Sequence, residues 1–363
     1  MFVAAHNAAH VWGGLERATS LLLAGLARRG HRVLLFCNDA RVAEGARALG
    51  VPAEVLVLGG DAMLHHAARF ARRLGEDRPD ALVISSFQKV WLGGMGARLA
   101  GVPRVVARIG LENYTPYSWK YRLAFGRWVD AVVVNAARMR PPFLALPGWS
   151  EARVATIHNG VWPRPRSAPG GLRRELGIPE DAPVVGAMAR LARQKRLDRL
   201  LHALALLPPG VHCLVAGEGP ERQALAALAA ELGLGARVHF LGFREDVGDV
   251  LEALDLLLVT SDTEGLSNTM LEALAAGVPV VSTPVSGADE ALDPLPDGRR
   301  PGLVVGFTPE EVAAAVRELL ADPARRAGMG SAARERAEER FGFERMLDRW
   351  EAVLGAPGGG GDA

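Results

Sequence analysis

The sequence contains only two cysteines, Cys37 in RVLLFCN and Cys213 in VHCLVAG, and each lies at the end of an apolar run typical of a buried strand. This usage excludes a disulfide framework and fits a reducing compartment. The chain also lacks any run of about 18 apolar residues, and its first residues, MFVAAHNAAHVWGG, show no basic segment followed by an apolar one. Neither a membrane-spanning helix nor a signal peptide is predicted, so we expect a cytoplasmic protein.

The chain has no contiguous block of basic residues, which argues against a nucleic-acid partner. Its charge is nevertheless divided unevenly. Residues 1–162 hold 20 Lys and Arg against 11 Asp and Glu, whereas residues 163–363 hold 22 against 30. A basic first half is consistent with an anionic ligand or an anionic membrane surface, and equally with arginine-rich usage that has no functional meaning.

Apolar runs of strand length alternate with amphipathic helical stretches along most of the 363 residues. Strands are predicted at 32–36, 81–86, 104–109 and 131–135, with a helix over 14–30. After residue 162 come strands at 184–189, 211–217, 238–242, 254–261, 279–283 and 302–306, with helices over 196–207 and 221–232. The pattern predicts an α/β protein with two Rossmann-like domains, each a doubly wound parallel sheet.

The predicted domains cover residues 1–162 and 163–340, joined by the proline-rich linker VWPRPRSAPGG at 161–171. A hinge there would place a ligand cleft between the domains, at the carboxyl ends of the strands. Residues 341–355 predict a last helix that must dock on another element, because one of its faces is apolar: Phe343, Met346, Leu347, Trp350 and Leu354. The glycine-rich residues 356–363 predict a disordered tail.

Two glutamates eight positions apart, Glu264 and Glu272, bracket the predicted start of a helix in TEGLSNTMLEALAAG. Gly265 allows a sharp turn after the strand, the helix begins near residues 267–269, and Gly277 suits its end. Free backbone N–H groups at such a helix start favour a phosphate. Because the two carboxylates flank this anion site, they suit a ligand with hydroxyls on both sides of a phosphate, such as a sugar nucleotide. A simpler interpretation is that TMLE (269–272) is a capping box, in which Glu272 only closes the helix start.

Two further segments carry groups suited to phosphate. Arg190 and Lys195 lie in RLARQK, just after the first strand of the second half, where two cations could meet the same anion. Gly13 and Gly14 precede the first helix and would allow the backbone to approach a ligand closely. Taken alone, the cations could equally be a surface charge pair.

Together and in this order, the segments resemble the retaining glycosyltransferases of family 4, which have the two-domain GT-B fold. The resemblance rests on GGLERA (13–18), HNGV (158–161), RLARQKRLDRLLHAL (190–204), LVAGEGPERQALAALAAELGLGARVHFLGF (214–243) and EGLSNTMLEALAAGVPVV (264–281), and it covers nearly the whole chain. It implies transfer of a sugar, with retention, from a UDP- or GDP-sugar to an acceptor. It also implies that the last helix crosses back to the first domain.

By the same resemblance, Glu272 holds the ribose and Glu264 the donor sugar, while Arg190 and Lys195 neutralise the diphosphate as the sugar–oxygen bond breaks. Glu264, Arg190 and Lys195 are thus the implied catalytic residues. The other implied donor contacts are Gly14, Phe243, Arg244, Gly265, Leu266, Ser267, Asn268 and Thr269. No cofactor is expected. Nor is a metal, because the chain contains no Asp-x-Asp and the near miss DTE (262–264) includes the sugar-binding Glu264.

One position departs from the family. Many relatives carry His-Gly where this chain has Ile109 and Gly110, so no general base is assigned. Gly13, Arg108 and Glu112 are expected near the acceptor, although Arg108 and Glu112 would also suit a purely structural charge pair. A saccharide or a lipid-linked molecule is the expected acceptor.

Aromatic and basic residues mix in YTPYSWKYRLAFGRW (114–128), and MRPPFLALPGW (139–149) adds apolar residues that look exposed. This pattern predicts peripheral contact with the inner face of an anionic membrane, the alternative being helices packed on the domain core. Other functions stay open: a catalytically silent sugar-nucleotide-binding protein, or an epimerase or phosphorylase of the same fold. An NAD-dependent oxidoreductase is disfavoured, because no Gly-x-Gly-x-x-Gly follows the first strand and GEGPER (217–222) is incomplete.

Overall fold

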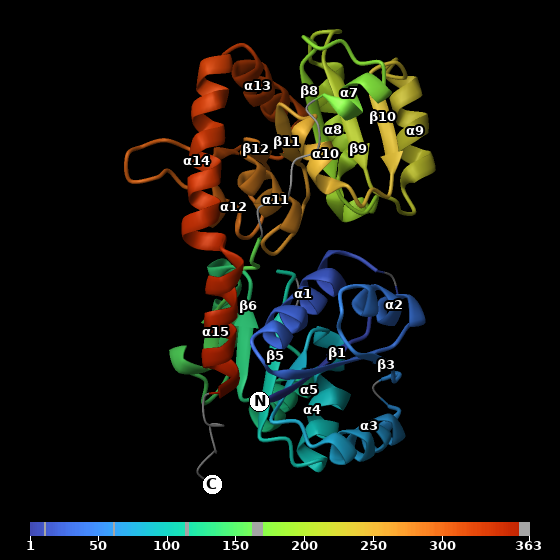
Figure 1. Ribbon diagram of the computed structural model, residues 1–363, viewed down its shortest axis with the longest axis vertical. Coiled ribbons are helices and arrows are strands. Elements are labelled where there is room, and N and C mark those ends of the chain that lie inside the picture. Colours follow the sequence, from blue (N-terminus) through green and yellow to red (C-terminus); the bar gives the residue numbers. More distant parts are fainter. Residues whose placement is uncertain (11, 61, 113–115, 162–169, 356–363) are drawn as a thin grey trace. The chain divides into compact units, whose positions relative to one another are not determined.

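The computed structural model describes residues 1–10, 12–60, 62–112, 116–161 and 170–355. The chain forms two compact units (Figure 1). Unit 1 comprises Met1–Asn159 together with the chain from Glu344 onward, and unit 2 comprises Gly160–Phe343. The predicted linker at 161–171 and tail at 356–363 fall largely or wholly outside the described residues.

Unit 1 is built on a seven-stranded parallel sheet with the order β3-β2-β1-β4-β5-β6-β7. Its strands are β1 (Phe2–Asn7), β2 (Arg32–Cys37), β3 (Ala53–Val55), β4 (Ala81–Ile84), β5 (Arg104–Ile109), β6 (Ala131–Val134) and β7 (Val154–Thr156). The order reverses between β1 and β4, and such a switch point lets the loops after the two strands diverge and leave room for a ligand.

Helices cover both faces of the first sheet (Figure 1). They are α1 (Gly14–Arg28), α2 (Ala40–Ala48), α3 (Leu64–Asp77), α4 (Val90–Leu99), α5 (Trp119–Trp128) and α6 (Pro141–Leu144). Phe70 of α3, Val90 of α4 and Phe125 of α5 join one apolar core with Leu82 and Val132 of the strands. This core therefore fixes the sheet against α3, α4 and α5.

Helix α15 (Phe343–Gly355) docks on unit 1, as predicted for residues 341–355. The five apolar residues expected on one face are all buried: Phe343, Met346, Leu347, Trp350 and Leu354. Arg29, just after α1, forms ion pairs with Glu344 and Glu351, each at 2.6 Å, and with Asp348 at 2.8 Å. Apolar packing and a cluster of charges together hold the end of the described chain to the first unit.

Unit 2 is built on a six-stranded parallel sheet with the order β10-β9-β8-β11-β12-β13. Its strands are β8 (Val184–Met188), β9 (His212–Ala216), β10 (Val238–Gly242), β11 (Leu256–Val259), β12 (Val280–Ser282) and β13 (Gly302–Val304). Its helices are α7 (Gly171–Glu175), α8 (Leu197–Ala205), α9 (Arg222–Glu231), α10 (Val247–Glu252), α11 (Asn268–Ala276), α12 (Ala288–Leu292), α13 (Pro309–Leu320) and α14 (Pro323–Phe341). The order again reverses once, between β8 and β11.

Alternate side chains of β11 enter two different cores, which shows that this sheet is covered on both faces. Leu257 and Val259 pack with α11 and α14, whereas Leu256 and Leu258 pack with α8 and α13. The unbroken apolar run LLLV is the pattern expected of a parallel strand buried on both sides. Both doubly wound sheets and the returning C-terminal helix of the predicted fold are thus confirmed.

Some expectations change in detail. The two units divide between residues 159 and 160 and between residues 343 and 344, whereas the sequence predicted boundaries at 162/163 and 340/341. Cys37 and Cys213 are buried free thiols, as expected. The expected exposure of the apolar residues in 139–149 is wrong: Met139, Phe143 and Trp149 are buried in the core of unit 1.

Helix α5 has two different faces. Ala124 and Phe125 are buried, whereas Trp119 and Leu123 are 74% and 47% exposed, next to Tyr117 at 76%. Across the described residues, no helix combines the length and apolar character needed to cross a bilayer. One side of α5 therefore packs on the core of unit 1, and the other side lies at the surface, so each of the two interpretations of this segment applies to one side of the helix.

Replacing Arg29 by Ala should weaken the attachment of α15, because one guanidinium serves three carboxylates. We expect the free energy of unfolding to fall by on the order of 1 kcal/mol, with faster hydrogen exchange in residues 344–355. The effect should shrink in high salt, which screens partly exposed charges. Arg345→Ala, on the exposed side of the same helix, is the control. Equal exchange in the two variants would contradict the assignment.

Candidate functional site

The loops after β8 and β11 leave the second sheet at its switch point and carry most of the predicted donor residues. Strands β8 and β11 are hydrogen-bonded neighbours, and the loops after them hold Arg190 with Lys195 and Glu264 with Gly265, respectively. Ligands of doubly wound sheets bind at such a point, outside the carboxyl ends of the strands. The fold therefore brings the two motifs, about 70 positions apart in the sequence, to one place.

Hydrogen bonds join these two loops directly. The Thr260 hydroxyl lies 3.2 Å from the carbonyl oxygen of Lys195 and 3.0 Å from that of Arg196, while the N–H of Asp262 donates to Gln194 O at 2.9 Å. The buried Arg199 donates to the carbonyl oxygen of Thr260 and, at 2.8 Å, to Asp262 Oδ1. The position of each loop is thus fixed by the other.

Arg196 has a left-handed backbone, with φ of 47°, an unusual conformation for a residue other than glycine. Its guanidinium pairs with Asp198 at 3.0 Å and with Asp262 at 3.1 Å. Burial raises the pKa of Asp262, but hydrogen bonds from Arg199 and Arg196 lower it by more, so the net shift is downward. The charge pairs hold the strained turn that presents Lys195.

Glu264 is buried and forms an ion pair with Lys195. The hydroxyl of Ser261 donates a second hydrogen bond to the same carboxylate oxygen, at 2.8 Å. Arg190, by contrast, is exposed, and its guanidinium has no partner among the described residues. One predicted cation therefore already neutralises a predicted carboxylate, while the other is available to an anion.

Helix α11 begins where predicted, at Asn268, and ends at Gly277, whose φ is 76°. Its N-cap is Ser267, which accepts the N–H of Met270 at 3.5 Å. The capping-box interpretation of residues 269–272 is therefore wrong, because Glu272 lies at the fifth helical position, beyond the reach of a capping glutamate at the third. The partly buried Glu272 needs another explanation.

Glycines let the loops approach one another closely. A Cβ on Gly217 would lie 1.9 Å from Ala189 O, and one on Gly219 would lie 2.4 Å from Leu191 O, so GEGP packs directly on the segment that carries Arg190. On the other side, a Cβ on Gly287 would lie 3.0 Å from the Cα of Leu266. The sequence GEGPER thus serves backbone packing in this chain.

Phe243 and Arg244 follow β10, the edge strand, which β9 and β8 separate from β11. Phe243 is 58% exposed, and Arg244 pairs with Asp246, 2.5 Å away. The structure leaves the Phe243 ring open to a ligand but does not place these two residues at the loops described above.

The described residues contain no group of three or more His, Cys, Asp or Glu side chains that could hold a metal ion. In DTE, Asp262 and Glu264 are each paired with cations of this chain.

In unit 1, a cluster of buried polar side chains lies at the carboxyl ends of the strands. Arg108 of β5 is 5% exposed and donates to Thr19 Oγ1 at 2.7 Å and to Asn159 Oδ1 at 2.9 Å. Burial lowers its pKa to about 10. Glu112 pairs instead with Arg138, at 3.4 Å, so the suggested pair of Arg108 with Glu112 does not form.

Gly13 and Gly14 form the turn into α1, with Gly13 as its N-cap. Glu16, which the sequence interpretation did not single out, lies below this turn and is 7% exposed. Thr19, Ser261 and Arg199 were also missed. The only signal for them in the sequence is a polar residue within an otherwise apolar stretch, and that signal does not name a partner.

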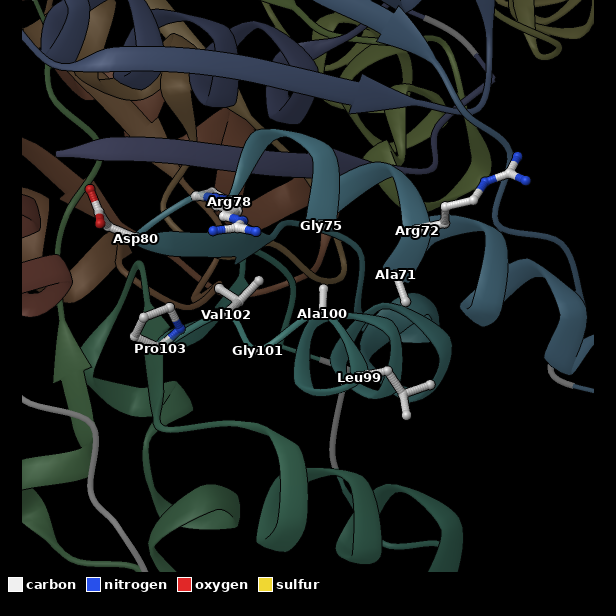
Figure 2. A pocket seen from close by; sticks show the side chains of 11 residues that line it. Ala71, Arg72, Gly75, Arg78, Asp80, Leu99, Ala100, Gly101, Val102 and Pro103 are labelled. Atoms are coloured by element: carbon white, nitrogen blue, oxygen red, sulfur yellow. The ribbon is translucent and has the colours of Figure 1, made fainter.

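A hollow of about 580 Å³ lies elsewhere on unit 1 (Figure 2). Its lining comes from the ends of α3 and α4 and from the segments that follow them, including Arg78, Asp80, Leu99 and Pro103. Asp80 directly precedes β4 and Pro103 directly precedes β5, so the hollow lies at the amino ends of the strands. It is on the opposite edge of the sheet from the polar cluster.

Two family models match the chain: Glycosyl transferase 4-like domain over residues 13–160, and Glycosyl transferases group 1 over residues 171–336. Together they extend over most of both units and include every predicted site residue. The chain belongs to the family 4 type of glycosyltransferases.

Curated relatives of this family 4 chain include the lipopolysaccharide core biosynthesis glycosyltransferase LpsE of Rhizobium meliloti, 33% identical over 64% of this chain and 66% of that protein. A 2-deoxystreptamine glucosyltransferase of Streptomyces kanamyceticus is 29% identical over 81% of this chain and 82% of its own length. Other relatives are matched over about half of their length. Among solved structures, Anabaena HepE in complex with UDP and glucose has a TM-score of 0.85 at 23% identity, covering 98% of this chain and 99% of its own. That likeness shows the shared GT-B fold.

Gly217→Ala should destabilise unit 2, because the new Cβ would collide with the carbonyl oxygen of Ala189. A φ of 134° is also unfavourable for alanine. Because this strain adds to the overpacking, we expect the free energy of unfolding, measured by urea titration, to fall by about 2 to 5 kcal/mol. Gly233→Ala is the control, since Gly233 also has a positive φ but nothing within 4 Å of its Cβ position. Its loss should stay at about 1 to 2 kcal/mol, and equal losses would contradict the close-packing role.

Proposed function

We propose that this family 4 protein transfers a hexosyl group, with retention, from a UDP- or GDP-sugar to an acceptor in the synthesis of cell-surface glycans or glycolipids. The observation that carries the proposal is the convergence of Lys195, Glu264 and the start of α11 at the switch point of the second sheet. The relative that acts in lipopolysaccharide core synthesis and the neighbour bound to UDP and glucose support the substrate classes.

In the proposed donor site, Glu272 accepts hydrogen bonds from the ribose and Glu264 from hydroxyls of the donor sugar. The backbone N–H groups at the start of α11 take the diphosphate, because a helix start favours an anion. The proposed contacts there are Gly265, Leu266, Ser267, Asn268 and Thr269, with Phe243 and Arg244 near the base. Gly14 is proposed as a further donor contact.

Arg190 and Lys195 are the proposed cations that stabilise the leaving diphosphate. Its negative charge grows as the glycosidic bond breaks, so fixed cations favour the transition state over the bound substrate. Without a ligand, Lys195 pairs with Glu264. A bound diphosphate would compete for its ammonium and would free the Glu264 carboxylate for sugar hydroxyls.

We propose that the transfer needs no metal ion. Arg190, the start of α11 and Lys195, once the diphosphate draws it from Glu264, can together neutralise the diphosphate, while Asp262 of DTE stays paired with Arg196 and Arg199. The acceptor attacks from the face that the diphosphate leaves, with leaving-group stabilisation as the main catalytic contribution. The position of the family histidine is Ile109, which is 1% exposed and packs in the core.

For the acceptor we propose a saccharide or a lipid-linked molecule at the carboxyl edge of the first sheet, near Gly13 and Glu112. Arg108 belongs to the same edge, but its guanidinium is buried and hydrogen-bonded on both sides. We therefore propose that Arg108 acts by positioning its neighbours.

Because the family histidine is absent, a second function must also be tested, that of a catalytically silent sugar-nucleotide-binding protein. Such a protein would bind donor and form no product. Incubating wild-type protein with a matching donor and acceptor, and following the anomeric proton of the first product by NMR, separates the two. A product with the donor's anomeric configuration supports retaining transfer, whereas an isomerised free nucleotide sugar would indicate an epimerase.

Glu272→Ala should weaken donor binding by the roughly 1.5 to 3 kcal/mol typical of hydrogen bonds to a charged group, or about 10- to 150-fold in Kd. Thermal shift against UDP-, GDP-, ADP- and dTDP-sugars, with and without EDTA, identifies the base and provides the titration. Glu339→Ala, at an exposed position of α14, is the control. If the Kd of Glu272→Ala stays within twofold of wild type, the ribose assignment is wrong.

Peripheral membrane contact is proposed for α5, whose exposed face carries Trp119 and Leu123. The helix holds Lys120, Arg122 and Arg127 and no acidic residue, so it should bind anionic lipid. Replacing the three basic residues by Glu should abolish flotation with phosphatidylserine liposomes, while donor binding in unit 2 is retained. Unchanged flotation would disprove this contact.

A further inference from the structure

Glu16 is a buried carboxyl group directly below the Gly13–Gly14 turn. Its Oε1 lies 3.4 Å from Nδ2 of Asn7, the last residue of β1, and a Cβ on Gly13 would come within 3.0 Å of its Oε2. Glu16 is the third residue of α1, so its carboxylate can accept the N–H of the N-cap, Gly13. It therefore joins the end of the first strand to the glycine turn.

Glu16 interacts electrostatically with the guanidinium of Arg108 on β5, which lowers the pKa of the carboxyl group. Arg108 is itself fixed by Thr19, one helical turn beyond Glu16 on α1, and by Asn159 after β7. Two opposite charges are thus buried at the first turns of α1. Strands β1 and β5 and the segment after β7 all contribute contacts to this arrangement.

Keeping this carboxylate buried is unfavourable for the fold. Burial raises the pKa of Glu16 above its ordinary value of 4.5, and the hydrogen bonds from Glu16 N–H, Asn7 and Gly13, together with Arg108, only partly offset this effect. At neutral pH the carboxylate is easier to ionise in the unfolded chain, so Glu16 lowers stability there. Groups retained at such a cost are often functional.

A second glutamate in the chain shows what simple capping looks like. Glu311 is also the third residue of its helix, α13, and forms a complete capping box with Thr308, whose N–H and hydroxyl lie 3.1 Å and 2.7 Å from the carboxylate. The Thr308 hydrogen bonds lower the pKa of the exposed Glu311. The two glutamates thus have the same helical position and opposite pKa shifts.

We propose that Glu16 is a positioning residue for sugar transfer, which holds the Gly13–Gly14 turn against the end of β1 so that the backbone of the turn meets the substrate in one fixed geometry. The proposal rests on the proposed function, in which Gly13 and Gly14 contact acceptor and donor. Glu16 acts through the turn and does not touch the reacting atoms.

The test compares Glu16→Gln with Glu311→Gln in the full chain. Gln keeps the shape and one accepting oxygen but removes the charge, so Glu16→Gln should melt at or above the wild-type temperature at pH 7.5. Any gain should shrink as the pH falls and the wild-type carboxyl becomes protonated in the fold. We expect kcat for transfer to fall at least tenfold, with donor Kd within twofold of wild type. Glu311→Gln should show the reverse, a lower melting temperature and unchanged kcat.

The outcomes separate the two proposals. If wild type forms no product with any donor and acceptor pair, the proposed function fails. If wild type is active and Glu16→Gln keeps kcat within twofold, the positioning role is overturned. A loss of activity in Glu16→Gln accompanied by a clearly lower melting temperature at pH 7.5 would make Glu16 a simple capping residue, as Glu311 is, and would also overturn it.

Discussion

The contact on which the candidate donor site depends is the one between the loops after β8 and β11. Thr260 and Asp262 form hydrogen bonds with the turn that carries Lys195, and the buried Arg199 donates hydrogen bonds to both Thr260 and Asp262. The two strands are adjacent at the switch point, so the loops after them pack against each other, with GEGP against the first loop and Gly287 against the second. Without this contact, Glu264 and Lys195 would belong to independent loops, and the strained Arg196 would lose its ion pair with Asp262.

Carboxylates at the surface of the structure and carboxylates buried inside it differ in how they affect stability. At the surface, carboxylates such as Glu311 and those around Arg29 gain from their partners and support helix ends. At the carboxyl edges of the two sheets, Glu16 and Glu264 are buried and depend on Arg108 and Lys195 for compensation. Removing a carboxylate from water costs free energy, which its neighbours only partly offset at Glu16. Their place at the edge where ligands of this fold bind is consistent with a role in binding or catalysis.

Much of this organisation was predictable from the sequence. The run LLLV and its counterparts predicted buried parallel strands, since only a strand covered on both faces tolerates continuous apolar residues. The face formed by Phe343, Met346, Leu347, Trp350 and Leu354 predicted a docked helix. Local patterns failed where two interpretations share one pattern: TMLE has capping-box spacing although the helix begins at Asn268, and the apolar residues of 139–149 are core rather than surface.

The sequence by itself determined the two doubly wound sheets, the positions of the motifs on loops after strands, and the family, because strand periodicity, glycine placement and motif spacing are local properties. Only the tertiary structure decided which charges meet. Lys195 pairs with Glu264, Glu112 with Arg138 and not Arg108, and Glu16 lies under the glycine turn facing Arg108. Most of these residues lie on segments that follow different strands, and the order of strands in the sheet brings them together, which no local pattern records.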